Sequence, residues 1–501
     1  MIEIAESLRP VLAIACSALG AILVLLFSKR PNLRESWTLL ASILQFSIIL
    51  SMVPMILDGN TIECYLFTMF PGIHFGFKVD AFGLIFALTS SALWILVSIY
   101  SIGYMRALRE HAQTRYYFCF ALAIFGAVGV ALSGNLVTMY IFYEILTVST
   151  YPLVAHEQTS EALFAGRKYL AYLLTAGCVF LGAVVLTYSL AGTTDFDKGG
   201  ILTVAFASRS VLIILFILFL LGFMKAAYMP FHSWLPTAMV APTPVSALLH
   251  AVAVVKAGVF GIVRTVCYIY GIDLMHELGL GVILASFAAF TMIIASLFAI
   301  AQDDLKRRLA YSTISQLSYI IFGVALLSPM GITGAMIHIP FHGFMKITLF
   351  LCAGSILVAS GKKNISEMAG IGRAMPITMF AFTVGALGMC GVPPTGGFIS
   401  KWFLGLGTLQ AGNLIFLAVI LISSLLDVVY FFPIIYTAFF GKSEGTESSL
   451  SKGKKIKEAP LFMVVPLSIT ALFSIAFCFP NPVTDVILNL VRLVISNLGG
   501  G

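Results

Sequence analysis

Charged residues are scarce in this 501-residue sequence. Asp, Glu, Lys and Arg together make up 10% of it, whereas a typical soluble domain is about 25% charged. Hydrophobic residues make up 60%, and the mean hydropathy is +1.02. This composition excludes an ordinary soluble domain. It predicts a polytopic membrane protein whose main partner is the lipid bilayer.

Clustered cysteines and long polar stretches are also missing. The eight cysteines occur singly, without a C-x-x-C motif, so neither an iron–sulfur cluster nor a disulfide framework is indicated and we expect no cofactor. Only residues 442–458, "KSEGTESSLSKGKKIKE", have the composition of a linker. We therefore expect no soluble domain.

What recurs instead is the apolar stretch. A helix needs roughly 20 apolar residues to cross a bilayer core of about 30 Å, and about fourteen such stretches are centred near residues 18, 47, 92, 124, 145, 179, 219, 255, 290, 317, 345, 395, 425 and 470. A membrane barrel would show short alternating segments. The sequence thus predicts an all-α membrane protein with about 14 transmembrane helices, the first of which lacks a cleavage site and is retained.

Basic residues predict the orientation. Alternate loops hold 19 of the 29 Lys and Arg residues, and the opposite loops together with both termini hold five. Loops rich in Lys and Arg stay in the cytoplasm, so both termini are expected on the non-cytoplasmic side of the cell membrane. This bias accounts for the net charge of +7, and no nucleic-acid partner is indicated. The 19 residues are Lys29, Arg30, Arg34, Arg106, Arg109, Arg115, Arg167, Lys168, Lys306, Arg307, Arg308, Lys362, Lys363, Arg373, Lys442, Lys452, Lys454, Lys455 and Lys457.

A few charges lie inside the apolar stretches. A charge near the centre of a spanning helix costs about 2.5–3.5 kcal/mol, so each must either reach an interface, neutralise a buried acid or serve a function. Glu144 lies too deep in its stretch to reach an interface and needs a cation. Lys225 is suited to pair with it, because a lysine can lose its proton when desolvated and regain it beside a carboxylate. Arg264 stays protonated, so we expect it to be structural.

His338, His342 and Lys346 stand four residues apart and so share one helical face. Two imidazoles and an amine can pass protons through intervening water. A metal site is the alternative, but no third Cys, His or carboxylate lies nearby in sequence and Pro340 disturbs the helix. We expect no metal site here.

Prolines mark interrupted helices. Pro230 follows Lys225 by five residues, and Pro393 and Pro394 precede Lys401 by seven. Interrupted helices are tolerated at membrane depth only where they line an enclosed or watery cavity. The two elements suggest an inverted repeat of five helices. The expected division is 1–110 for the first three helices, 111–271 and 272–441 for the repeats, 442–459 for a cytoplasmic loop, and 460–501 for the last helix with a short tail.

Four stretches carry a family resemblance: "MKAAYMPFHSWLPTAMVAPTPVSALLHAVAVVKAG", "DDLKRRLAYSTISQLSY", "FHGFMKITLFLCAGS" and "GVPPTGGFISKW". They resemble the antiporter-like subunits shared by Mrp cation/proton antiporters, respiratory complex I and membrane-bound hydrogenases. The resemblance is strongest to the D-type component of Mrp antiporters, with one complex I type behind it. It implies a hydrated axis for protons made by Glu144, Lys225, His250, Lys256, His338, His342, Lys346 and Lys401.

The function that this resemblance implies is proton translocation within a larger membrane complex. In the first hypothesis, proton flux is coupled to the exchange of Na⁺ by an Mrp-type antiporter. In the second, the chain is a proton-pumping module of a complex I-type dehydrogenase or a membrane-bound hydrogenase, without a redox centre of its own. In the third, the buried charges only hold helices together. Other membrane subunits are the expected partners in the first two.

Overall fold

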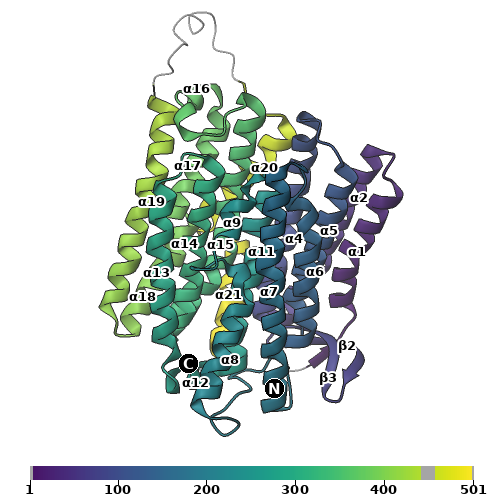
Figure 1. Cartoon of the computed structure of the whole chain (residues 1–501), viewed down its shortest axis with the longest axis vertical. Coiled ribbons are helices and arrows are strands. Elements are labelled where there is room, and N and C mark those ends of the chain that lie inside the picture. The colour runs from purple at the N-terminus through teal and green to yellow at the C-terminus, as the bar shows by residue number, and fades with distance from the viewer. Residues whose placement is uncertain (1–3, 442–456, 499–501) are drawn as a thin grey trace, which may run out of the picture.

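The computed structural model describes residues 4–441 and 457–498. Long helices run side by side between the two ends of the molecule, and a small sheet lies at one end (Figure 1). In the first half the helices are α1 (Arg9–Leu26), α2 (Pro31–Leu50), α3 (Val53–Leu57), α4 (Ala81–Ala107), α5 (Gln113–Leu132), α6 (Leu136–Val154), α7 (Ser160–Ala191), α8 (Arg209–Gly222), α9 (Trp234–Thr237), α10 (Thr243–Ala247), α11 (Val254–Arg264) and α12 (Gly271–Glu277).

The second half continues the same arrangement. Its helices are α13 (Leu280–Ile300), α14 (Leu305–Ala325), α15 (Pro329–Ser360), α16 (Ile371–Ala374), α17 (Pro376–Cys390), α18 (Gly396–Gln410), α19 (Leu414–Phe440), α20 (Leu461–Ala476) and α21 (Pro482–Asn497). Among the described residues, ten helical segments are long and apolar enough to span a membrane, and α8, α17 and α20 are shorter apolar helices. The total of fourteen spans therefore stays a prediction.

The expectation of an all-α chain was wrong at one end of the bundle. Strand β1 (Ile4–Glu6) pairs in parallel with β2 (Thr61–Phe70), which pairs antiparallel with β3 (Ile73–Val79). Gly72, with φ +73°, makes the tight turn between β2 and β3. Strands β2 and β3 have 10 and 7 residues, fewer than the roughly 20 apolar residues that a spanning helix needs, so a search for apolar stretches does not find them. They lie beyond the helix ends, where open sheet edges can be hydrated (Figure 1).

The most deeply buried element is the segment Thr243–Glu277. Its most apolar window is entirely buried, and it is not a regular α-helix. Residues Leu248–Val252 and Thr265–Tyr270 form π-helical turns on either side of α11. Such turns are frequent at functional sites, because the extra residue per turn disturbs the backbone ladder.

Two other helices are interrupted at the prolines. Helix α8 ends at Gly222 and is followed by a 3₁₀ turn over Met224–Ala226, so that Lys225 lies in the break. Helix α17 ends at Cys390, and α18 begins at Gly396 after the two prolines. The inverted symmetry that would relate the two breaks stays a prediction.

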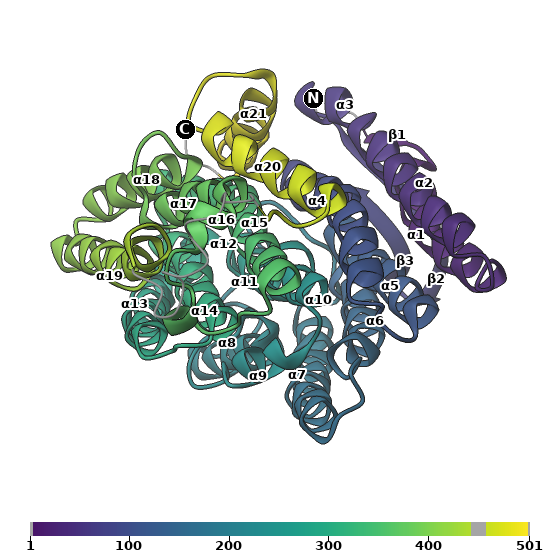
Figure 2. The ribbon, with the colours of Figure 1, turned by 90° about the horizontal axis from the view of Figure 1, so that it is seen from above.

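The carboxy-terminal region differs from the expected single helix with a short tail. Helix α20 is followed by α21, and both pack against α4 and α15. Figure 2 shows these two helices beside α4, while α1 and α2 form a pair at the edge of the molecule. Most of the predicted loop 442–459 lies outside the described residues.

Candidate proton-transfer site

An acid–base pair lies where the broken helix meets α6. Nζ of Lys225 lies 3.8 Å from Oε1 of Glu144 and donates a hydrogen bond to the carbonyl of Tyr143 at 3.0 Å. The Lys225 side chain is fully buried, whereas that of Glu144 is 20% exposed. At 3.8 Å the two groups attract each other without a direct hydrogen bond, so a small movement is enough to close or open the pair.

Two glycines make room for this pair. A Cβ on Gly177 of α7 would lie 2.4 Å from Oε1 of Glu144, so glycine leaves space for the carboxylate at its present position. A Cβ on Gly258 of α11 would lie 2.2 Å from the backbone nitrogen of Ala226. The break that carries Lys225 therefore rests directly on α11, two residues from Lys256.

Lys256 is the first member of a buried row of polar side chains. The row consists of Lys256, His342, His338, Gln316, Asp427 and Lys401. Nζ of Lys256 lies 2.8 Å from Nδ1 of His342 on α15, and both side chains are buried. Lys256 lies in the first turn of α11, which follows the π-helical turn Leu248–Val252. Because His342 lies on α15, the amine and the imidazole meet between two helices that are distant in sequence.

The row continues from His342 to His338 on the same face of α15. The two ring centroids are 5.6 Å apart. Nδ1 of His338 lies 2.8 Å from Oγ of Ser400, and its Nε2 lies 3.1 Å from Oε1 of Gln316. Because Oε1 of Gln316 can only accept, Nε2 of the neutral ring carries the proton and Nδ1 accepts from the Ser400 hydroxyl.

A second acid–base pair ends the row, and the sequence analysis missed its acid. Lys401 donates to Oδ2 of Asp427 at 2.6 Å, and Gln316 donates to the same oxygen at 2.8 Å. The hydroxyl of Tyr430 donates to Oδ1 at 2.6 Å. Asp427 is fully buried. The sequence does contain an indication of this residue, because Asp427 is the sole acid in the apolar stretch that forms α19.

Two predicted residues stand beside this row. Lys346, also on α15, donates to Oγ of Ser312. His250 lies in the π-helical turn and packs against Phe350, with ring centroids 4.6 Å apart. Within the described chain neither ring nitrogen of His250 has a hydrogen-bond partner, so this buried ring has unused capacity for a water molecule.

A cavity of about 590 Å³ opens at the end of the bundle that carries the basic loops. Its charged lining comes from four separate loops, and Thr243 of α10 lies among its lining residues. Those loops therefore share one end of the molecule. The charged residues that line the cavity are Glu110, Glu157, Glu161, Asp304, Lys306, Arg307, Lys362 and Lys363.

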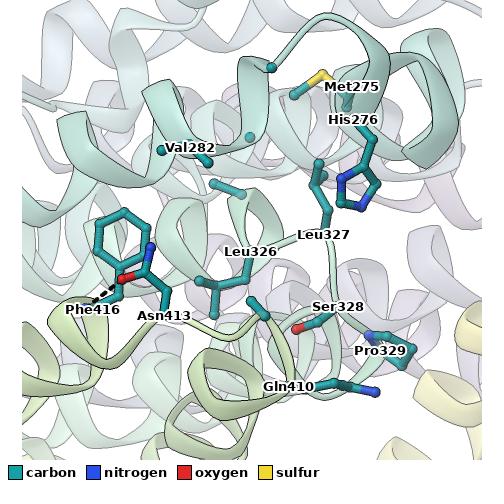
Figure 3. A pocket seen from close by; sticks show the side chains of 14 residues that line it. Met275, His276, Val282, Leu326, Leu327, Ser328, Pro329, Gln410, Asn413 and Phe416 are labelled. Atoms are coloured by element: carbon teal, nitrogen blue, oxygen red, sulfur yellow. Dashed lines mark hydrogen bonds between the residues drawn. The ribbon is translucent and has the colours of Figure 1, made fainter.

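A second cavity, of about 450 Å³, lies where α12, α14 and α18 end. Figure 3 shows His276, Ser328, Gln410 and Asn413 around it, with Asn413 accepting from the backbone of Phe416. It is less charged than the first cavity. The described chain thus has one charged cavity at the end with the basic loops and a second cavity at the ends of α12, α14 and α18.

Arg264 has the structural surroundings that its permanent charge predicts. Its guanidinium donates to Oδ1 of Asp80 at 2.7 Å and lies 4.5 Å from the ring centroid of Tyr268. The rings of Phe82, Phe196 and Phe260 surround it at about 5 Å. This pair connects α11 to the start of α4, and neither residue makes a hydrogen bond to the row within the described chain.

Comparison with known proteins places the chain in a family. Residues 133–427 match the family described as "NADH:quinone oxidoreductase/Mrp antiporter, TM", and residues 70–117 match "NADH-Ubiquinone oxidoreductase (complex I), chain 5 N-terminus". The chain is 35% identical to NADH-quinone oxidoreductase subunit N of Desulforudis audaxviator over 68% of each protein. It is 31% identical to Na⁺/H⁺ antiporter subunit A1 of Staphylococcus haemolyticus over 90% of this chain, but over only 58% of that longer protein.

Two solved structures have the same fold. The membrane-bound sulfane sulfur reductase, an archaeal respiratory membrane complex, contains a chain that matches with a TM-score of 0.85 at 25% identity, covering 99% of this chain and 100% of that one. A chain of the Mrp complex from Dietzia sp. DQ12-45-1b also matches with a TM-score of 0.85, at 22% identity over 98% and 97%.

Proposed function

Since the chain belongs to the family of NADH:quinone oxidoreductase and Mrp antiporter membrane subunits, we propose that it translocates protons within a multi-subunit membrane complex. The observation that carries this proposal is the buried contact series from Lys256 through His342, His338 and Gln316 to Asp427. Lys256, His342, His338 and Asp427 are titratable, and Gln316 bridges His338 to Asp427 by hydrogen bonds. A structural cluster would not need four titratable groups in series.

The two acid–base pairs act as protonation switches at the ends of the row. When Lys225 approaches Glu144, the charged pair is stabilised; when they separate, the buried amine releases its proton toward Lys256. Lys401 and Asp427 do the same at the other end. A membrane potential supplies about 2.3 kcal/mol per charge per 100 mV, which is enough to bias such a pair.

Protons are taken up from the cavity at the basic end. Thr243 lines that cavity, and Ser246 and His250 follow at helical spacing toward the row. Within the described chain, Oγ of Ser246 and both nitrogens of His250 lack hydrogen-bond partners although they are buried. Water between these groups would supply the partners and complete the path. In this proposal the basic end faces the cytoplasm, and both termini lie on the other side.

The complex is an Mrp-type antiporter that exchanges Na⁺ for H⁺, in which this chain takes the place of the D-type component. Support for an antiporter comes from the likeness to antiporter subunits over 90% or more of this chain; these relatives are A subunits, of which the match covers 58% and 60%, and the D-type assignment rests on the motif resemblance alone. The second candidate is the proton-pumping subunit of a complex I-type dehydrogenase. It is favoured by the likeness to NADH-quinone oxidoreductase subunit N, since that match covers 68% of each protein. Iron–sulfur absorbance in the purified native complex would select the second candidate, and a cluster-free complex would select the first.

The proton-transfer role is tested with Glu144→Ala and Lys225→Ala in the assembled complex. We expect either change to abolish cation-dependent proton flux in inverted vesicles, measured with a pH-sensitive dye, while the amount of complex is checked by immunoblot. The swap Glu144→Lys with Lys225→Glu serves as control, because a purely structural pair tolerates it. Full flux in both single variants contradicts the proposal.

A further inference from the structure

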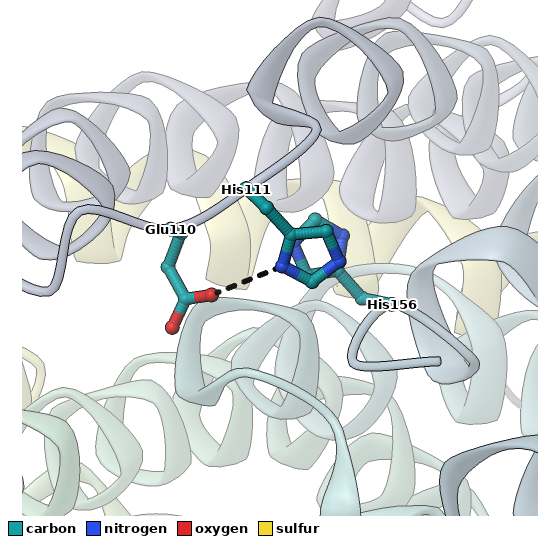
Figure 4. A group of neighbouring side chains, drawn as sticks. All are labelled: Glu110, His111 and His156. Carbon is teal, nitrogen blue, oxygen red and sulfur yellow. Dashed lines mark ion pairs between the residues drawn. The ribbon is translucent and has the colours of Figure 1, made fainter. Parts of the chain in front are cut away.

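Three metal-binding side chains meet at the basic end, away from the row. Glu110 and His111 belong to the loop between α4 and α5, and His156 belongs to the loop between α6 and α7 (Figure 4). One ligand atom from each lies within 4.8 Å of the other two. The rings of His111 and His156 overlap with centroids 4.8 Å apart, and Oε2 of Glu110 lies 4.0 Å from Nδ1 of His111.

The surroundings of His156 are a second, independent indication that a ligand binds here. Its side chain is fully buried, yet neither ring nitrogen has a hydrogen-bond partner among the residues that the structure describes. Buried polar groups in native proteins are nearly always satisfied by protein, water or an ion. His111 is reachable from outside, because its side chain is 46% exposed, and Glu110 lines the cavity at the basic end.

From this geometry we propose that Glu110, His111 and His156 form a Zn²⁺-binding site that connects the two loops. Two imidazoles and one carboxylate are ligands that zinc accepts, and a three-residue set leaves the fourth position open for water. Tetrahedral ligands at zinc distances lie about 3.4 Å apart, and the three atoms lie within 4.8 Å of one another, so they must approach by at most about 1.4 Å. Rotation of the exposed His111 and of Glu110 provides that movement.

The charges around the site set its strength. Arg115 donates to the carbonyl of His156 and repels a cation. Glu157, which lines the same cavity as Glu110, offsets that repulsion. We expect weaker binding than at a closed four-ligand structural site.

The site lies at the rim of the proton-uptake cavity, because Glu110 lines both. A zinc ion there would hold the end of α4 against the start of α7. The sequence alone does not predict this group, since its members come from two loops and only the fold brings them together. In the pair His338 and His342, by contrast, three of the four ring nitrogens already have partners, in Ser400, Gln316 and Lys256.

The test is zinc binding by the purified whole complex, measured by equilibrium dialysis against micromolar free Zn²⁺ with elemental analysis. We expect one zinc ion per copy of this chain in the wild type. His111→Ala and His156→Ala should each weaken it about 100-fold or more, beyond the 10–100-fold cost of losing an outer partner. His111→Cys should retain binding, because thiolate is a zinc ligand.

The matched control is His276→Ala, an exposed histidine in a different cavity, which should leave zinc binding unchanged. His111 is exposed, so its replacement will not unfold the chain even if the His156 variant does. Equal zinc content in wild type, His111→Ala and Glu110→Gln would overturn the proposal. So would a wild-type complex without bound zinc under these conditions.

Discussion

Lys401 and Asp427 form a buried ion pair, with Nζ of the lysine 2.6 Å from Oδ2 of the aspartate. It joins α18, just after its break, to α19. The pair resembles that of Lys225 and Glu144, which also connects an interrupted helix to a neighbour. The two pairs differ in distance: the Lys401–Asp427 pair is hydrogen-bonded, whereas Nζ of Lys225 lies 3.8 Å from Oε1 of Glu144, too far for a hydrogen bond.

The first prediction concerns this closed pair. Asp427→Asn should lower proton flux at least tenfold, because Lys401 loses the charge that holds its proton. Breaking a buried pair from one side costs about 3–5 kcal/mol, so assembly is expected to fall as well. The double variant Asp427→Asn with Lys401→Met should restore assembly without restoring flux. Recovery of flux in the double variant would mean that the pair is only structural.

The second prediction uses the glycine beside Glu144. Gly177→Ala puts a methyl group 2.4 Å from the present position of the carboxylate, which must therefore move relative to Lys225. We expect reduced flux with an unchanged level of assembled complex. Gly182→Ala on the same helix is the matched control, since nothing lies within 4 Å of its added Cβ. Equal flux in the two variants would contradict a positional requirement for Glu144.

The third prediction separates stability from transport at Arg264. Asp80→Asn removes the ion pair while Asn retains the ability to cap α4, whose Gly83 nitrogen donates to Asp80. We expect a loss of about 3–5 kcal/mol, seen as a lower unfolding temperature of the complex in detergent. Flux per assembled complex should stay at the wild-type level. A loss of flux in fully assembled complex would place Arg264 in the transport path.

The fourth prediction tests the proposed uptake path. Ser246→Ala removes a buried hydroxyl that lacks a partner within the described chain, so thermal stability should stay equal or rise. Proton flux should nevertheless fall several-fold, because the path loses a group that binds water. Ser474→Ala is the control: its hydroxyl is buried but bonds to Thr470 in its own helix. Unchanged flux in the Ser246 variant would place the uptake path elsewhere.

Sequence patterns predicted the membrane character and the family, because apolar stretches and long motifs are continuous in the sequence and do not depend on tertiary packing. They also located the two interruptions, since proline removes a backbone donor wherever it lies. The sheet was missed because β2 and β3 are short segments between two apolar stretches. Helix α21 lies where the sequence predicts only a short tail, since packing on α4 and α15 is what stabilises it.

The sequence by itself determined that charge would be rare, that Glu144 would need a cation, and that His338, His342 and Lys346 would share a face. Only the tertiary structure decided which groups meet. It placed Asp427 against Lys401, Lys256 against His342, and His156 against His111. The physical reason is that the partners are far apart along the chain. Burial makes each charge require a partner, but the packing of remote helices against each other determines which partner it has.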